Sequence, residues 1–438
     1  MRRRALDELR KLRNSKVFRG SSGGLVLRLF SLAMALITSV AMARLLGPGD
    51  YGTYTFAISI VQLLALLSAL GFPRLLVREV AAFHAEKEWP LLRGVIRFSM
   101  ATALIAALVV AVLSAPVAAL LTRRSGEELL ITFWISLALI PLTVMLRLSE
   151  SSLRGLRQVV VGQISRELIR PCVHLLVLLP LLLLMPEARS PLVAASTQVL
   201  ALIVAVTVGL ILLVRRVPEE ARLADPEYRP LMWIQSAAPL LALGSMQVIA
   251  LRADIVMLGA LSSADAVGIY RVASRGADLS TYVAYAANMA FQPAISRMYA
   301  TGEFARLQLA LRKGARLTFL GTTAVVIVLV LFGKWVLTNV FGPAFEPGYP
   351  TLVILVASQL GAAAMGFTAS VLNMTGHERA TLKGFLAAAS LNLLLNGLLI
   401  PEFGATGAAV ATGASRLVWN ALLVWLSYRI LGVKTAIV

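Results

Sequence analysis

The sequence contains few charged residues and few of the residue types that form disulfides and metal sites. Only 14% of its 438 residues are charged, whereas a water-soluble domain carries about a quarter. It has one cysteine, Cys172, and three scattered histidines, His84, His174 and His377. A single cysteine excludes a disulfide framework, and neither a Cys/His metal site nor a bound cofactor is predicted.

Sequence signals of several other protein classes are missing. Residues 1–20 are polar and basic and lack the short apolar core of a secretory signal, so no cleaved targeting segment is expected. No Walker loop or other glycine-rich phosphate cradle occurs, which argues against ATP hydrolysis. A membrane glycosyltransferase or polymerase would show a large outer loop with clustered carboxylates or histidines. The predicted outer connections here are short, so we do not expect an enzyme.

The sequence is rich in long apolar runs. Hydrophobic residues make up 58% of the chain and the mean hydropathy is +0.82, so the apolar excess must face lipid. A helix needs about 20 apolar residues to cross a bilayer. Windows of that size predict an all-α polytopic membrane protein of about 12 transmembrane helices, near residues 23–43, 51–71, 98–121, 129–148, 163–185, 191–214, 232–261, 264–291, 317–340, 350–373, 384–400 and 407–431.

The basic residues predict the orientation of these helices. Lys and Arg total 41 against 22 Asp and Glu, and most of them fall in alternate connections, beginning with the tail 1–20. Short basic loops stay in the cytoplasm, so an even number of helices with both termini cytoplasmic is predicted. The net charge of +19 is then explained by topology and by contact with anionic lipid, and nucleic-acid binding is not expected.

The chain divides into two similar halves. We expect a cytoplasmic segment over 1–20, an N-terminal lobe over 21–214, a linker over 215–231 and a C-terminal lobe over 232–438. Gly52-Thr53-Tyr54 opens the second span, and Gly268-Ile269-Tyr270 opens the eighth at the equivalent position. Parallel repeats of this kind are typical of secondary transporters that bind substrate between the halves.

Apart from the arginines counted with the basic connections, among them Arg147, Arg166, Arg170 and Arg429, five arginines lie inside predicted spans: Arg28, Arg252, Arg271, Arg275 and Arg416. Each costs at least about 2.5 kcal/mol at the bilayer centre, so they should face protein or water. In the eighth span, one helical face carries Arg271, Arg275, Asp278, Tyr282 and Tyr285. A guanidinium binds phosphate oxygens with two parallel hydrogen bonds. We therefore predict an anionic substrate held by Arg28, Arg252, Arg271 and Arg275, with Tyr282 and Tyr285 stacking on sugars. The alternative is that these arginines are structural and pair with carboxylates or helix ends.

Asp254 and Asp278 are the acidic residues well inside the spans of the second half. Either is a candidate site for coupling to a proton or sodium gradient, or a structural partner of an arginine. Asn392 and Asn396 are expected to form hydrogen bonds between helices.

Three runs resemble a known family. Residues 43–52 (ARLLGPGDYG) resemble the end of the first helix in bacterial polysaccharide flippases, which belong to the multidrug/oligosaccharidyl-lipid/polysaccharide exporter superfamily. Residues 254–259 with 267–270, and residues 392–396 with 400–409, resemble later parts of the same family. Together the three runs extend the resemblance over essentially the whole chain.

The resemblance implies a V-shaped bundle of two six-helix lobes that alternates between inward-open and outward-open states. It also implies a monomer in the bacterial inner membrane that flips an undecaprenyl-pyrophosphate-linked oligosaccharide from the inner to the outer leaflet. This step feeds O-antigen, capsule or exopolysaccharide synthesis. The implied partners are the lipid-linked substrate, membrane lipids and polysaccharide polymerase or ligase machinery.

Two related functions remain open. A multidrug or small-metabolite antiporter of the same superfamily would depend on acidic cavity residues rather than on arginines. The lipid II flippases of the superfamily typically have fourteen helices, and the twelve predicted here argue against that assignment.

Overall fold

The computed structural model describes residues 16–121, 127–433 and 435–437, and every regular element in these ranges is a helix. Eight helical stretches are long and apolar enough to cross a membrane. Two of them, within α2 (Lys16–Ser68) and α16 (Glu378–Leu431), are each broken by one non-helical glycine, Gly47 and Gly404. Two further helices, α11 (Pro230–Leu261) and α12 (Ala264–Ala300), cover the seventh and eighth predicted spans, so the twelve predicted spans all fall in helical segments of the described residues.

By their internal packing, the residues form two compact units. Unit 1 contains residues 1–45 and 57–249, and unit 2 contains residues 46–56 and 250–438. The units differ from the expected lobes in two places, here called the exchanged segments: residues 46–56 of the expected N-terminal lobe belong to unit 2, and the expected linker and the start of the expected C-terminal lobe belong to unit 1. Residues 46–56 pack with the C-terminal part of the chain, and residues 215–249 pack with the N-terminal part.

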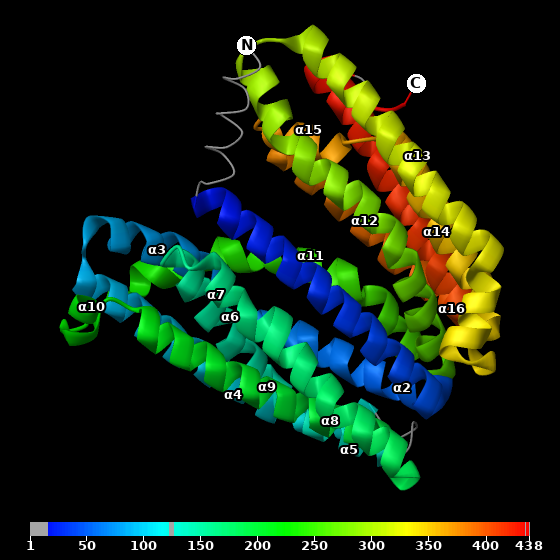
Figure 1. Ribbon diagram of the computed structural model, residues 1–438, viewed down its shortest axis with the longest axis horizontal. Helices are drawn as coiled ribbons and strands as arrows, with labels where there is room; N and C mark the ends of the chain where they lie inside the picture. Colours follow the sequence, from blue (N-terminus) through cyan, green and yellow to red (C-terminus); the bar gives the residue numbers. More distant parts are fainter. Residues whose placement is uncertain (1–15, 122–126, 434, 438) are drawn as a thin grey trace. The chain divides into compact units, whose positions relative to one another are not determined.

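Unit 1 is built around α6 (Leu139–Gly155), which packs against α3 (Phe72–Glu86), α4 (Trp89–Leu121) and α9 (Pro191–Arg216) (Figure 1). The helix α9 also contacts α5 (Glu127–Leu137) and α8 (Arg170–Leu184). A short helix α7 (Val159–Ile164) and the π-helical turn η1 (Ser165–Ile169) precede α8.

The connection between the second and third spans is itself a helix, α3. Phe72, Leu75, Leu76, Val80 and Phe83 are buried on one of its faces. This spacing gives an amphipathic helix whose apolar side packs on the unit, so its basic residues can stay outside the apolar region. The sequence pattern alone predicts a basic connection here rather than a helix.

The expected linker packs firmly against unit 1. Glu227 donates its backbone N–H to the carbonyl of Pro90 at 3.1 Å, and a Cβ on Gly94 would lie 1.8 Å from the carbonyl oxygen of Glu227. The short helix α10 (Glu219–Leu223) contacts α4. The segment is therefore part of the folded unit.

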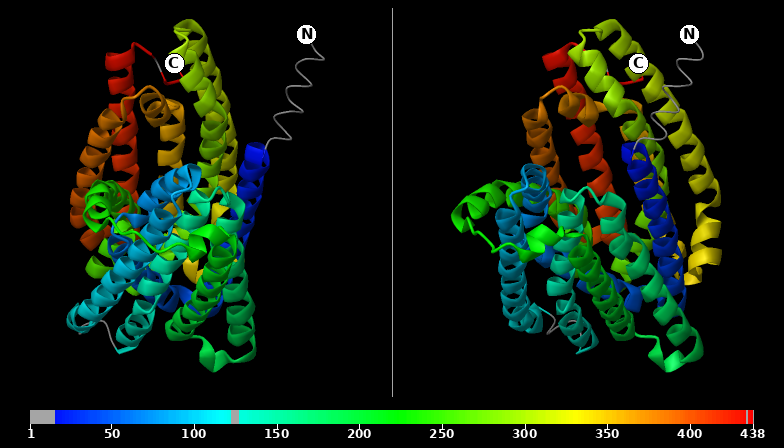
Figure 2. Two further views of the ribbon diagram at one scale, coloured as in Figure 1. Left: turned by 90° about the vertical axis from the view of Figure 1, so that its left-hand side faces the viewer. Right: turned by 60° about the vertical axis from the view of Figure 1, so that its left-hand side comes forward.

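In unit 2, the helices α12, α13 (Phe304–Val336), α14 (Tyr349–Met365) and α16 run side by side (Figures 1 and 2). A further short helix, α15 (Thr368–Met374), packs against α12 and α16. A hydrophobic cluster that includes Ile295, Leu311 and Phe367 joins α12, α13 and the start of α15.

The two corners that repeat in the sequence contact each other within unit 2. A Cβ on Gly52 would lie 1.8 Å from the carbonyl oxygen of Ala264, and a Cβ on Gly268 would lie 2.1 Å from that of Pro48. Each glycine thus lets the backbone of the other corner approach closely, which no residue with a side chain would permit without a shift. The internal repeat therefore has a reciprocal structural role.

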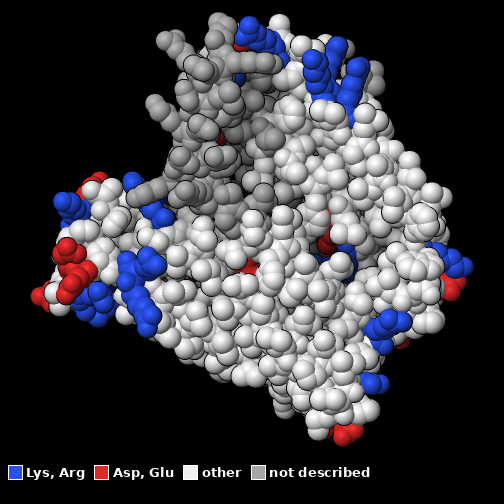
Figure 3. All heavy atoms as spheres, in the orientation of Figure 1, with Lys and Arg blue, Asp and Glu red and all other residues white. Residues whose placement is uncertain are grey.

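Charged residues on the face shown in Figure 3 gather at helix ends. Lys and Arg lie around α10 and the neighbouring end of α3, and at the turn between α12 and α13, whereas most of the helix sides are uncharged apart from a few acidic and basic atoms near the middle of the face. This is the distribution expected when helix sides face lipid and helix ends face water.

Candidate functional site

The predicted arginine stripe lies on α12, which is one continuous helix from Ala264 to Ala300. Ser263 caps the start of the helix, and its hydroxyl accepts a hydrogen bond from the backbone N–H of Ala266 at 3.2 Å. Because the helix is regular through these positions and its proline, Pro293, lies further along, residues three, four and seven apart share a face. The local sequence therefore presents Arg271, Arg275 and Asp278 in one row.

Arg275 is the centre of this stripe. Its charge interacts most strongly with Arg271, and then with Tyr51, Asp278 and Tyr282. Its guanidinium is partly buried, and its Nε is buried without a hydrogen-bond partner among the described residues. Two adjacent guanidinium groups repel each other, and one carboxylate balances one of them. The row therefore favours an anion.

The position of Arg275 along the helix strengthens the preference of this row for an anion. It lies about eleven residues after the start of α12, which is about 16 Å along the axis at 1.5 Å per residue. The hydrocarbon core is about 30 Å thick, so Arg275 lies near its middle if the helix begins at the membrane surface. Tyr282 and Tyr285 follow on the same helix and are half-buried and exposed, respectively.

Asp254 on α11 is held by two hydroxyl groups. Tyr270 donates to Asp254 Oδ2 at 2.7 Å, and Thr412 donates to the same oxygen at 2.9 Å. The other carboxylate oxygen, Oδ1, is buried without a hydrogen-bond partner among the described residues. The Asp254 carboxylate is therefore oriented by α12 and α16 and retains capacity to accept a proton or a cation.

Arg416 lies close enough to Asp254 to interact with it electrostatically, but its guanidinium donates to the hydroxyl of Ser358 at 3.0 Å. The described residues contain no ion pair between Asp254 and an arginine. No pattern in the sequence identifies Tyr270, Thr412 or Ser358 as partners of these charged side chains. Thr412 is separated from Asp254 by 158 positions, so no local pattern could have revealed the contact.

The structure places the other predicted site residues as follows. Arg252 is half-buried on α11, and Asp278 is exposed on α12 beside Arg275. Arg28 is exposed on α2 and belongs to unit 1. Unit 2 thus brings Arg271, Arg275, Asp278 and Tyr282 together.

The expectation for Asn392 and Asn396 is wrong. Asn396 donates its amide to the Asn392 side-chain oxygen at 3.0 Å, one turn away in the same helix. The Asn396 Oδ1 atom is buried without a partner among the described residues. Residues at i and i+4 are neighbours on one helix, so this bond does not join two helices.

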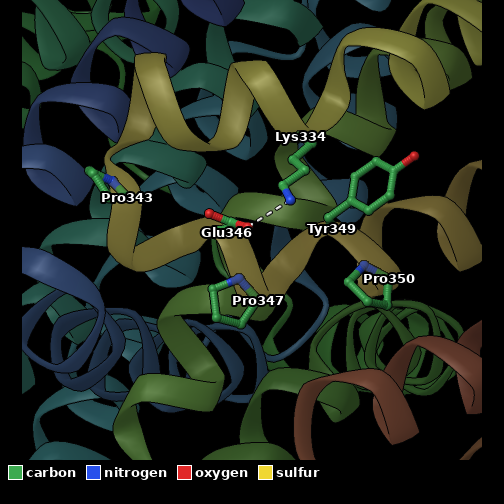
Figure 4. A pocket seen from close by; sticks show the side chains of 6 residues that line it. All are labelled: Lys334, Pro343, Glu346, Pro347, Tyr349 and Pro350. Atoms are coloured by element: carbon green, nitrogen blue, oxygen red, sulfur yellow. Dashed lines mark ion pairs between the residues drawn. The ribbon is translucent and has the colours of Figure 1, made fainter.

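A shallow pocket lies between the end of α13 and the start of α14 (Figure 4). It is lined by three prolines with Lys334, Glu346 and Tyr349. Lys334 Nζ and Glu346 Oε1 form an ion pair at 2.8 Å, and both side chains are largely exposed. An exposed pair contributes about 0–1 kcal/mol, and it leaves the pocket without a charge surplus. The described residues also contain no cluster of three His, Cys, Asp or Glu that would hold a metal ion.

The helix arrangement defines the class of protein. It is similar to an inward-facing multidrug resistance MATE-family transporter of the MOP superfamily, with a TM-score of 0.72, 14% identity and coverage of 93% of this chain and 98% of that one. It is also similar to the lipid II flippase MurJ, with a TM-score of 0.71, 12% identity and coverage of 93% and 87%. A MOP superfamily transporter from Pyrococcus furiosus matches with a TM-score of 0.61, 12% identity and coverage of 94% and 95%. The chain therefore has the two-lobe fold of the MOP superfamily transporters.

Within that class, residues 18–299 match the family model described as "Polysaccharide biosynthesis protein". This chain belongs to the polysaccharide biosynthesis protein family. It is also 26% identical over 182 residues to the uncharacterized membrane protein MJ1068 of Methanocaldococcus jannaschii. That match covers 41% of this chain and 35% of the relative, so it spans about a third of the relative's length.

Proposed function

We propose that the protein is a flippase that moves a polyprenyl-(pyro)phosphate-linked oligosaccharide from the cytoplasmic to the outer leaflet. The observation that carries this proposal is the pair Arg271 and Arg275, one turn apart on α12, the helix of the eighth predicted span, with a single carboxylate, Asp278, beside them. Membership of the polysaccharide biosynthesis family supports a saccharide as the cargo. The similarity in fold to MOP transporters supports alternating access as the mechanism.

In this mechanism, Arg271 and Arg275 bind the phosphate oxygens through charge-assisted hydrogen bonds. Tyr282 and Tyr285 lie further along α12 and stack on sugar rings. Arg28 and Arg252 supply further positive charge. The polyprenyl tail stays in the lipid, because transferring it into water would cost about 0.8 kcal/mol for each CH₂ group.

A proton or sodium gradient drives the cycle in this proposal. Asp254 is the first candidate for coupling, because two hydroxyls orient its carboxylate and one of its oxygens has no described partner. Asp278 is the second candidate, since it is exposed beside Arg275. Coupling requires that the bound ion stabilises one state of the transporter more than the other.

We further propose that the protein is a monomer in the bacterial inner membrane with both termini cytoplasmic. It would supply O-antigen, capsule or exopolysaccharide synthesis and work beside a polymerase or ligase. The placement of Lys and Arg in alternate connections supports this orientation.

Leaflet-resolved detection of lipid-linked oligosaccharide tests the proposal. Cells that lack the gene are complemented with wild type, Arg275→Ala, Arg275→Lys or Arg297→Ala. Arg297 is a matched control, because it is an exposed arginine near the end of the same helix. We expect the oligosaccharide to accumulate on the cytoplasmic face, and wild type and Arg297→Ala to clear it. Arg275→Ala should lose at least tenfold in rate, since a charge-assisted hydrogen bond contributes about 1.5–3 kcal/mol.

Normal appearance of the glycan outside cells that lack the gene would refute the flippase proposal. The second candidate is then an antiporter that exports drugs or small metabolites, for which Asp254 is the favouring observation. In that case drug efflux would be lost in Asp254→Asn and retained in Arg275→Ala.

A further inference from the structure

A buried histidine of unit 1 has no part in the function proposed above. His174 lies on α8, one turn after Arg170, and only 6% of the residue is exposed. The helix packs against α9, η1 and the short helical turn η2 (Pro186–Ala188), and Figure 1 shows α8 and α9 in the same bundle. A neutral imidazole has one ring nitrogen that donates and one that accepts a hydrogen bond. The partners of these two nitrogens therefore decide what the ring can do.

The side-chain amide of Gln198 joins His174 to Arg170. Gln198 lies on α9, is 4% exposed, and satisfies both neighbours in a single orientation. Its oxygen accepts hydrogen bonds from Arg170 Nε at 3.0 Å and from Arg170 Nη2, and its NH₂ group donates to His174 Nδ1 at 2.9 Å. One amide thus connects a group that is always charged with a group that can titrate.

The hydrogen bond from Gln198 fixes the tautomer of the ring. A nitrogen that accepts a hydrogen bond carries no proton, so the neutral His174 ring bears its proton on Nε2. The Nε2 atom is buried without a hydrogen-bond partner among the described residues. The backbone of Ala194 on α9 interacts with the ring from nearby, but it does not complete a hydrogen bond to Nε2. The ring is therefore oriented through Nδ1.

A proton on His174 is incompatible with this arrangement. The imidazolium ring carries an N–H at both nitrogens, so its Nδ1–H would face the NH₂ group of Gln198, donor against donor. Rotation of the amide by half a turn brings its oxygen to His174. The same rotation turns the NH₂ group toward Arg170, whose guanidinium has donors only. Protonation of His174 and the hydrogen bonds from Arg170 to Gln198 therefore exclude each other.

The charged surroundings of His174 reinforce this exclusion. Arg170 is the charged residue that interacts with the ring, so a proton on the ring would place two cations on one amide. The elements packed against α8 carry these other charged groups: Arg166 and Glu167 on η1, Glu187 on η2, and Arg215 and Arg216 at the far end of α9. Cys172 lies two positions from His174 and so faces a different side of α8.

The backbone beside Arg170 is irregular. Ser165–Ile169 form a π-helical turn in an otherwise α-helical span and end directly before Arg170. Such turns occur mostly as single insertions in α-helices and frequently at functional sites. Arg170 is half-buried, whereas His174 and Gln198 are buried. Of the three side chains, Arg170 is therefore the one that water can reach and that can leave the amide.

We propose that His174 is a proton-binding site in unit 1 and that Gln198 is the switch that the proton turns. When the ring is neutral, Gln198 holds Arg170. When a proton binds to Nδ1, the amide rotates, accepts a hydrogen bond from the ring and releases Arg170. Only the proton is added, and only hydrogen bonds are exchanged. The site shares no residue with Asp254 or with the stripe on α12, so the proposal does not depend on the function proposed above.

Nitrogen-15 NMR of the histidine rings in the full-length protein in nanodiscs tests the tautomer. The chain has three histidines, and the signal that is lost in His174→Gln belongs to His174. At pH 8 we expect the neutral ring with its proton on Nε2 and with Nδ1 as a hydrogen-bond acceptor. As the pH falls, the new proton should appear on Nδ1. A ring that carries its proton on Nδ1 at pH 8 would overturn the proposal.

Gln198→Glu tests the role of the amide with little change in size. A carboxylate accepts hydrogen bonds from Arg170 and from a protonated ring at the same time, so we expect His174 to be protonated at pH 7 in this variant. Gln359→Glu is the matched control, because Gln359 is a buried glutamine on α14 of unit 2; it should leave the His174 signal unchanged. An unchanged tautomer in Gln198→Glu, or a ring that stays neutral in wild type and in this variant wherever they are folded, contradicts a switch.

Reciprocity provides a second check. If the proton releases Arg170, loss of Arg170 must favour the proton. Arg170→Met should raise the ratio of protonated to neutral His174 at least about tenfold at a fixed pH, which is within the usual range of coupling. In a Gln198→Leu background the same substitution should raise it only about threefold, because charge repulsion alone remains. Arg78→Met is the control, since Arg78 is an exposed arginine of the same unit, and it should not change the ratio. Equal effects of Arg170→Met in the two backgrounds would show that the amide transmits nothing and would refute the proposal.

Discussion

The reciprocal glycine contact of unit 2 allows a sharp prediction about stability. In Gly268→Ala, the new Cβ would lie 2.1 Å from the carbonyl oxygen of Pro48, and in Gly52→Ala it would lie 1.8 Å from that of Ala264. Both neighbours are backbone atoms, so no side chain can move aside. The helices would have to separate by roughly 1.3–1.6 Å to restore an ordinary contact of 3.4 Å.

We expect each substitution to destabilise the protein by about 3 kcal/mol, which is the upper end of typical overpacking costs, since the contact is with backbone. The double variant should cost less than the sum of the two single variants. Both glycines lie in one helix crossing, and a crossing that is already opened accommodates the second methyl group more easily.

Thermal unfolding in detergent, followed by intrinsic fluorescence, measures these effects. Gly397→Ala is the matched control in the same unit, because its Cβ would meet nothing closer than Met257 Cε at 3.9 Å. Alanine is favoured over glycine inside a helix by about 1 kcal/mol, so the control should be neutral or stabilised. Melting temperatures of Gly268→Ala and Gly397→Ala that agree within error would refute the reasoning, as would strict additivity of the two glycine variants.

Two further predictions concern hydrogen bonds to carboxylates. Tyr270→Phe removes the 2.7 Å donor to Asp254 and leaves Thr412 as the remaining donor; we expect a loss of about 1–2 kcal/mol in thermal unfolding, against no change in the exposed control Tyr428→Phe. Glu303 accepts hydrogen bonds from Arg306 and Thr301, which lower the pKa of its carboxyl below 4.5. The stabilisation from this carboxylate is present above the unfolded pKa and lost as the pH falls through the folded pKa. The melting temperatures of wild type and Glu303→Gln should therefore differ slightly at pH 7 and converge below pH 4.5; a difference that grows with acidity would contradict the assignment.

The membrane spans could be predicted because lipid imposes a simple requirement. A helix that crosses a bilayer needs a long apolar run, and such runs are visible without knowledge of the neighbours. The breaks at Gly47 and Gly404 fall between predicted spans for the same reason. The helix α3 was missed, because an amphipathic segment lacks the length and apolarity of a span.

The stripe on α12 could be predicted as a stripe, since helical spacing alone places Arg271 and Arg275 on one face. The environment of Asp254 could not be predicted, because its partners Tyr270 and Thr412 come from other helices. The π-helical turn at Ser165–Ile169 was equally hidden, because it depends on one irregular hydrogen-bonding pattern rather than on composition.

The exchanged segments of the two units have a consequence for dissecting the protein. A chain cut within residues 217–229 would yield an N-terminal fragment without residues 230–249 of its own unit and a C-terminal fragment without residues 46–56 of its own. Neither half-gene therefore encodes a complete folding unit. Separately expressed halves should be degraded, whereas co-expressed halves should assemble by mutual complementation. Shuffling halves between relatives would succeed only where both corner sequences are exchanged as a matched pair.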